Sequence, residues 1–113
     1  MTLKKAKRIT GLDIQVVISD KDFVAEATDT DKSIAKVSGH NLKIVLSILV
    51  EQIYALNRQV AMERADFKCE LCGSRSNLQC HHKIHRSMGR RDDTPGNLQV
   101  LCFQCHERHH RGK

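Results

Sequence analysis

The spacing of hydrophobic residues along the chain changes at about residue 40. Between residues 12 and 38, apolar and polar residues alternate in three short runs, at 14–18, 23–27 and 34–37. Alternation of this kind is typical of half-buried strands, and the Asp and Lys residues between the runs predict turns. We therefore expect two or three short strands in this region.

A helical spacing follows the strands. From about Asn41 to Ala65, apolar residues recur at steps of three and four, at Leu42, Val45, Leu46, Leu49, Ile53, Leu56 and Val60. This spacing predicts an amphipathic helix or a pair of helices. Gly39 precedes the segment, and Asn41 is a suitable N-cap.

The order of strands and helix, together with the segment DFVAEATD, resembles HicB-like antitoxin domains. That resemblance implies a small α+β fold that binds DNA or a protein partner. The alternative is a packing platform, or a dimerisation surface formed by the helix of residues 41–65.

The composition changes again near residue 66, where aliphatic residues become scarce and Cys, His and Arg become frequent. We expect four further elements there: a strand at 78–84, a loop at 85–96, a strand at 97–101 and a short helix at 103–111. The expected fold class is α+β, with strands and a long helix in residues 1–57 and a metal-bound ββα module in residues 58–113.

Size and composition limit how this second module can be stabilised. The chain has 113 residues, with three Phe, one Tyr and no Trp, so its core will be thin. No apolar run is long enough to span a membrane and no apolar signal segment follows the N-terminus, so we expect a cytoplasmic protein without a membrane partner. In a reducing compartment, its five cysteines favour metal binding over disulfides.

Four of the cysteines form two Cys-x-x-Cys pairs, Cys69 with Cys72 and Cys102 with Cys105. A two-residue gap lets both sulfurs of a pair face one ion, and two pairs complete the tetrahedral shell of a structural Zn²⁺. Between the pairs lie 29 residues, which we expect to be a folded excursion whose ends the zinc holds together. Cys80 is left over, and we interpret it as a small apolar strand residue.

Six of the seven histidines lie between residues 81 and 110. His106 and His110 are one helical turn apart, so both can bind one metal ion from the same face of a helix. A third ligand must come from elsewhere, and His81 or His82 at the end of the first strand is the obvious donor. An imidazole titrates near neutral pH and is suited to deprotonating a water molecule.

These residues together resemble the ββα-metal motif of HNH endonucleases. The resemblance rests on the pair His81-His82, on Asn97 fifteen residues after His82, and on the pair His106-x-x-x-His110. The segments ERADFKCELCG, GRRDDTPGNLQVLC and CHERHH are similar to the zinc-bearing members of that family, so the resemblance covers about residues 58–111. Stand-alone members of this length resemble those carried by phages and mobile elements.

The resemblance implies a role for each residue of the motif. His82 would be the general base, His81, His106 and His110 the ligands of a catalytic divalent cation, and Asn97 the residue that braces the loop. Many family members have Asp where His81 stands. An all-histidine shell is neutral and favours Zn²⁺, Ni²⁺ or Mn²⁺ over a strict requirement for Mg²⁺, so the identity of the ion stays open.

The charge of the chain agrees with a polyanionic partner. The formal net charge is +6, and residues 67–113 carry nine Lys or Arg against four Asp or Glu. Basic residues of the expected loop and of the strand end before it are suited to flanking phosphates. These are Lys83, Arg86, Arg90 and Arg91.

We therefore expect an endonuclease that hydrolyses the phosphodiester bonds of DNA, which is expected to be double-stranded, and the resemblance implies products with a 5′-phosphate and a 3′-hydroxyl. Two alternatives from other classes stay open. One is a non-catalytic DNA-binding protein of the zinc-finger type, and the other is an antitoxin-like regulator that acts through residues 12–60.

Overall fold

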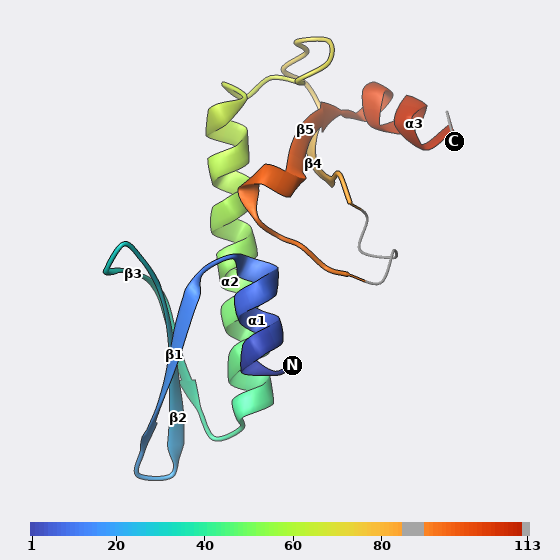
Figure 1. Ribbon diagram of the computed structural model, residues 1–113. Helices are drawn as coiled ribbons and strands as arrows, with labels where there is room; N and C mark the ends of the chain where they lie inside the picture. Colours follow the sequence, from blue (N-terminus) through green and yellow to red (C-terminus); the bar gives the residue numbers. More distant parts are fainter. Residues whose placement is uncertain (85–89, 112–113) are drawn as a thin grey trace. The chain divides into compact units, whose positions relative to one another are not determined.

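The structure is a computed structural model that describes the backbone of residues 1–84 and 90–111 and the side chains up to residue 108 (Figure 1). It divides into two compact units, Met1–Ala55 and Leu56–Lys113. Helices and two small sheets alternate along the chain, which confirms the α+β class. No helix among the described residues is both long enough and apolar enough to cross a membrane.

The first unit opens with a helix that the sequence analysis did not predict, α1 (Leu3–Thr10). Thr2 caps its start, because the Thr2 hydroxyl accepts a hydrogen bond from the backbone N–H of Lys5 at 3.1 Å. Gly11 ends it in the left-handed conformation, with φ of 71°. The basic residues lie on the solvent side, while Ala6 and Ile9 are fully buried.

Three antiparallel strands follow in the order β1 (Asp13–Ser19), β2 (Asp22–Asp29) and β3 (Lys32–Gly39). Their positions confirm the strands that the alternation predicts. Thr30 and Asp31 both have positive φ in the two-residue turn between β2 and β3, as tight hairpins require.

The long helix is continuous, α2 (Leu42–Arg64), and contributes residues to both units. Asn41 caps this helix, as the sequence predicts, because Asn41 Oδ1 accepts a hydrogen bond from the N–H of Ile44 at 3.2 Å. Gly39 lies close to the helix, since a Cβ there would be 3.0 Å from Val45 Cγ2. The core of the first unit joins α1, the sheet and α2 through ten buried residues: Ala6, Ile9, Ile14, Ala25, Ala27, Val45, Leu46, Leu49, Val50 and Ile53.

The second unit pairs two short strands, β4 (Leu78–His82) and β5 (Leu98–Cys102), in an antiparallel hairpin, and α3 (Phe103–Arg111) follows directly. A 3₁₀ turn, η2 (Pro95–Asn97), precedes β5. The order is the predicted ββα. Two bounds differ from prediction, because β4 ends at His82 instead of residue 84 and β5 begins one residue after Asn97.

The last turns of α2 are joined to the hairpin by polar contacts. Arg64 donates hydrogen bonds to the carbonyl oxygens of Pro95 at 2.9 Å and Leu98 at 2.7 Å. Asn57 donates to the carbonyl oxygen of Asp93 at 2.9 Å. These hydrogen bonds hold the segment that leads into β5 against α2 through the backbone carbonyl groups of that segment.

Candidate active site

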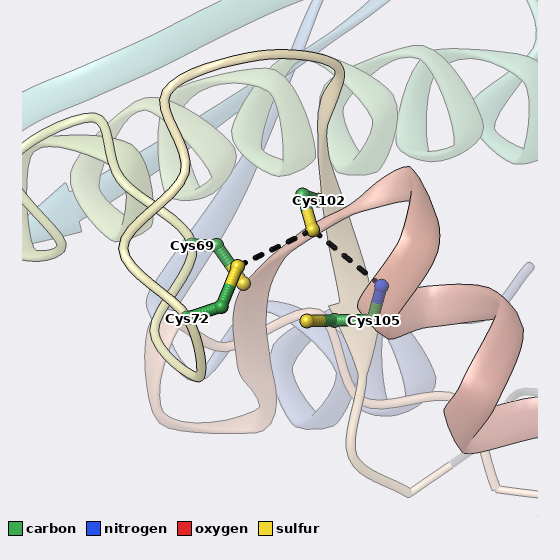
Figure 2. A group of neighbouring side chains, drawn as sticks. All are labelled: Cys69, Cys72, Cys102 and Cys105. Atoms are coloured by element: carbon green, nitrogen blue, oxygen red, sulfur yellow. Dashed lines mark hydrogen bonds between the residues drawn. The ribbon is translucent and has the colours of Figure 1, made fainter.

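The four cysteines of the two Cys-x-x-Cys pairs converge on one point (Figure 2). Their sulfur atoms all lie within 4.8 Å of one another, and the Sγ atoms of Cys72 and Cys102 are 3.6 Å apart. Three of the four side chains are buried, and Cys72 is exposed. We refer to Cys69, Cys72, Cys102 and Cys105 as the four-cysteine cluster, and it can bind one metal ion in the tetrahedral manner of a structural zinc.

Each pair is shaped by its own backbone. In the first, the N–H of Gly73 donates to the carbonyl oxygen of Cys69 at 2.9 Å, and Gly73 has a φ of 78° that favours glycine. In the second, the backbone N–H of Cys105 lies 3.5 Å from Cys102 Sγ because α3 begins between them. Both turns direct their sulfurs inward (Figure 2).

The pKa values of Cys69 and Cys105 are shifted in opposite directions because the surroundings of the two thiols differ. Burial alone would raise the pKa of Cys69, but hydrogen bonds from the backbone of Cys102, Cys72 and Leu71 outweigh it and lower this pKa to about 6. The pKa of Cys105 is raised to about 12, chiefly by hydrogen bonds to the thiols of Cys102 and Cys72. A metal-free cluster therefore keeps protons that metal binding releases.

Cys80 lies outside the cluster, on β4. Its Sγ is 3.8 Å from the carbonyl oxygen of Arg58, and burial raises its pKa. The half-buried thiol with a raised pKa forms the reactive thiolate less readily, which is compatible with the interpretation of Cys80 as a packing residue.

The structure brings two of the three predicted histidine ligands together. The rings of His81 on β4 and His106 on α3 have centroids 5.2 Å apart at an angle of 72°. Two imidazoles that bind one ion at metal–nitrogen distances of about 2.0–2.1 Å have ring centres roughly 5 Å apart, so this pair fits a shared cation. The side chain of the third predicted ligand, His110, lies outside the described residues.

His82 has a different neighbour. Its Nε2 lies 2.9 Å from Oδ1 of Asp93, a residue that is completely buried. Successive residues of a strand face opposite sides, and β4 is regular through His82, where it ends. The two adjacent histidines therefore meet different groups: His81 meets His106, and His82 meets Asp93.

Asp93 is the residue that the sequence analysis missed. Besides His82, its carboxylate binds the guanidinium of Arg91, whose Nε and Nη2 lie 2.9 and 2.8 Å from Oδ2. Its backbone carbonyl accepts the hydrogen bond from Asn57. The signal in the sequence was a pair of acidic residues, Asp92 and Asp93, after basic residues of the loop, which is too common to identify a site.

Asn97 joins the two ends of the loop. Its Oδ1 accepts a hydrogen bond from the N–H of Ile84 at 2.9 Å, and its Nδ2 donates to the carbonyl oxygen of Asp92 at 2.7 Å. The side chain is buried, so these bonds are not in competition with water. Its own carbonyl accepts from the N–H of Lys83 at 2.8 Å, which connects Asn97 to the residue after His82.

The predicted phosphate-binding residues differ in their surroundings. Lys83 and Arg90 are exposed. Arg91 is half-buried against Asp93, and its guanidinium is engaged there. Arg86 lies outside the described residues.

Residues 69–112 match the family described as HNH endonuclease. No curated protein and no solved structure shows significant similarity to the chain. The matched segment contains the four-cysteine cluster, the hairpin and α3. The similarity to HNH endonucleases thus lies entirely within the second unit.

The four-cysteine cluster leads to a prediction about stability. Cys72→Ser removes one thiolate at the exposed position, where little packing is lost, so its effect should report on the metal. We expect the parent protein to hold one zinc per chain in this cluster, and the variant to lose it and to unfold at least about 10 °C lower. Elemental analysis and circular-dichroism melting measure the two effects. Cys80→Ser is the matched control, and equal zinc content and melting in all three proteins would contradict the assignment.

Proposed function

We propose that the chain is a metal-dependent endonuclease that hydrolyses phosphodiester bonds of DNA. The match to HNH endonucleases supports the class. The observation that carries the proposal is the separation of the imidazoles into two settings, a pair suited to a shared cation and a third held by a carboxylate. Hydrolysis of a phosphodiester needs both, a cation for the phosphate and a base for the water.

His82 is proposed as the general base. It lies at the last position of β4, where the strand opens into the loop, and its side chain is about nine-tenths buried. An imidazole exchanges protons near neutral pH, so it can take a proton from water as the oxygen attacks phosphorus. The hydrogen bond to Asp93 holds its ring in place for that step.

His81 and His106 are proposed to hold the catalytic cation together with His110. The arrangement of the first two rings fits an imidazole-bound ion, and three protein ligands leave positions for phosphate oxygens. When bound, a divalent cation stabilises the negative charge that develops on the phosphoryl and leaving oxygens. Neutral imidazoles favour Zn²⁺, Ni²⁺ or Mn²⁺ over Mg²⁺, and we leave the ion open among these four.

Asn97 is proposed as a positioning residue. It joins Ile84 to Asp92 through hydrogen bonds, so the chain leaves β4 and returns to β5 at a fixed separation. The hydrogen bond between its carbonyl oxygen and the N–H of Lys83 holds the backbone at the residue that follows His82. The geometry of the proposed base therefore depends on Asn97 although Asn97 touches no reacting atom.

Double-stranded DNA is the proposed substrate, with products that carry a 5′-phosphate and a 3′-hydroxyl. The excess of basic residues in 67–113 supports a polyanionic partner. Lys83 and Arg90, both exposed near the proposed base and its loop, are suited to phosphate contacts, and Arg86 and Arg91 complete the proposed set.

The central test is plasmid cleavage by the full chain with Mg²⁺, Mn²⁺, Ni²⁺ or Zn²⁺. We expect nicked or linear plasmid with at least one ion, and a loss of about 100-fold or more in His82→Ala, because removal of a general base costs about 10²–10⁴-fold. DNA affinity, measured by fluorescence anisotropy, should stay within about threefold of the parent.

His40→Ala is the matched control, since His40 is an exposed histidine of the first unit. It should cleave as the parent does. Absence of cleavage with all four ions, combined with retained DNA binding, would contradict the enzyme and favour a zinc-finger-type binding protein. Retained cleavage by His82→Ala would contradict the assignment of the base.

We also propose that two copies of the chain associate through α2, which would supply two active sites for the two strands of a duplex. Ile44 and Ile48 are 58% and 44% exposed on one face of this helix. Lys43 and Glu51 lie on the same face, four residues to either side of Ser47. An antiparallel pair of helices centred on Ser47 would place each lysine opposite the glutamate of the other copy, which favours a second copy as the occupant.

Sedimentation velocity tests this association. We expect the parent to sediment as a dimer at micromolar concentrations and Ile48→Glu as a monomer, because the substitution buries a charge against the apolar face. Ile18→Glu changes an isoleucine that is 70% exposed on β1 and should remain dimeric. A monomeric parent, or a dimeric Ile48→Glu, would contradict the proposal.

A further inference from the structure

Each oxygen of the Asp93 carboxylate faces a different side chain. Oδ1 faces Nε2 of His82 at 2.9 Å, and Oδ2 receives both Nε and Nη2 of Arg91. Resting on the proposed function, we propose that Asp93 and Arg91 together determine which ring nitrogen of His82 carries the proton, and thereby make Nδ1 the atom that accepts a proton from water. Both are positioning residues, since neither touches the substrate.

The hydrogen-bonding chemistry of the three groups supports this assignment. A guanidinium only donates, and an ionised carboxylate only accepts. With Oδ2 committed to Arg91, Oδ1 presents an acceptor to the ring, so Nε2 must carry a hydrogen and donate it. In a neutral imidazole the second nitrogen then has the lone pair. Proton transfer from water to His82 therefore takes place at Nδ1.

The arrangement is held rigidly. Asp93 is 0% exposed, so water does not compete for its oxygens, and the hydrogen bond from Asn57 fixes its backbone. The side chain of Asp92, one residue earlier, instead accepts two hydrogen bonds from Thr94. The two neighbouring aspartates thus have different side-chain partners among the described residues, and the one that faces the His82 ring is Asp93.

A single substitution reverses the expected proton position. In Asp93→Asn, Arg91 can still bind only the amide oxygen, so that oxygen stays with Arg91 and the NH₂ group faces Nε2 of His82. Nε2 must then accept, the proton moves to Nδ1, and the base loses its lone pair at the reacting position. The same change at a catalytic carboxylate–histidine pair of serine proteases lowers kcat by about 10⁴-fold.

A second substitution should restore the original proton position. When Arg91→Ala is added to Asp93→Asn, the guanidinium no longer holds the amide oxygen, which can then turn toward His82, and Nε2 can donate again. The double variant should therefore cleave faster than the single variant, although it lacks more of the native contacts. A role of Asp93 in stability alone predicts the opposite order, because removal of a further partner from a buried group destabilises a protein.

The experiment compares the full-length, zinc-loaded parent with Asp93→Asn, Arg91→Ala/Asp93→Asn and the matched control Asp92→Asn. Nitrogen-15 NMR of the histidine side chains reports the protonated nitrogen, and His82→Ala identifies the signals of His82. We expect protonated Nε2 in the parent, in Asp92→Asn and in the double variant, and protonated Nδ1 in Asp93→Asn. In plasmid cleavage, kcat should fall about 100-fold or more in Asp93→Asn with KM within threefold, and recover at least tenfold in the double variant.

The outcomes separate this inference from the proposed function. Protonated Nδ1 in the parent would overturn the inference, and this result does not depend on cleavage activity. Equal cleavage by Asp93→Asn and the parent would also overturn it. A parent that does not cleave DNA while Nε2 is protonated would instead contradict the proposed function and leave the Asp93–Arg91 assignment supported.

Discussion

The convergence of four thiols on one point is the constraint on which the second unit depends. Among its described residues, the buried apolar side chains besides three of these cysteines are few, and they are Ala61, Leu98, Val100 and Leu101. A core of that size cannot offset the loss of chain entropy in a folded excursion of 29 residues. One metal ion held by the four-cysteine cluster would join the two ends of the excursion directly, so the metal would supply what apolar packing does not.

The position of the cluster also determines where the histidines lie. Cys102 ends β5 and Cys105 lies in α3, so His106 follows a cluster residue immediately and its ring meets His81 on the neighbouring strand. The other side of the site depends on hydrogen bonds. Asn97 joins the ends of the loop, and Asp93 holds His82. Outside the four-cysteine cluster, the arrangement of the proposed catalytic residues thus depends on a few buried polar groups. Their hydrogen bonds are strong because water is excluded.

Features of the chain with local causes could be predicted from the sequence. The alternation in 14–37 predicted two or three strands where three are found, and the three- and four-residue steps predicted helical structure where α2 lies. The Cys-x-x-Cys spacing predicted which sulfurs meet. Helix α1 was missed because its caps, Thr2 and Gly11, flank a run of lysines that resembles a solvated basic tail. Asp93 was missed for another reason. Two of its partners, His82 and Asn57, lie 11 and 36 residues away in the sequence, and only the folded chain brings them together.

The central claim is that the two sets of ligands bind metal separately, the cysteines for structure and the histidines for chemistry. X-ray absorption at the zinc edge tests it most directly, with one and then two equivalents of zinc added to metal-free protein. The account predicts a first shell of four sulfurs at about 2.3 Å with one equivalent, and additional nitrogen ligands at about 2.0–2.1 Å only with the second. A mixed sulfur and nitrogen shell at one equivalent would contradict the separation of the two sites.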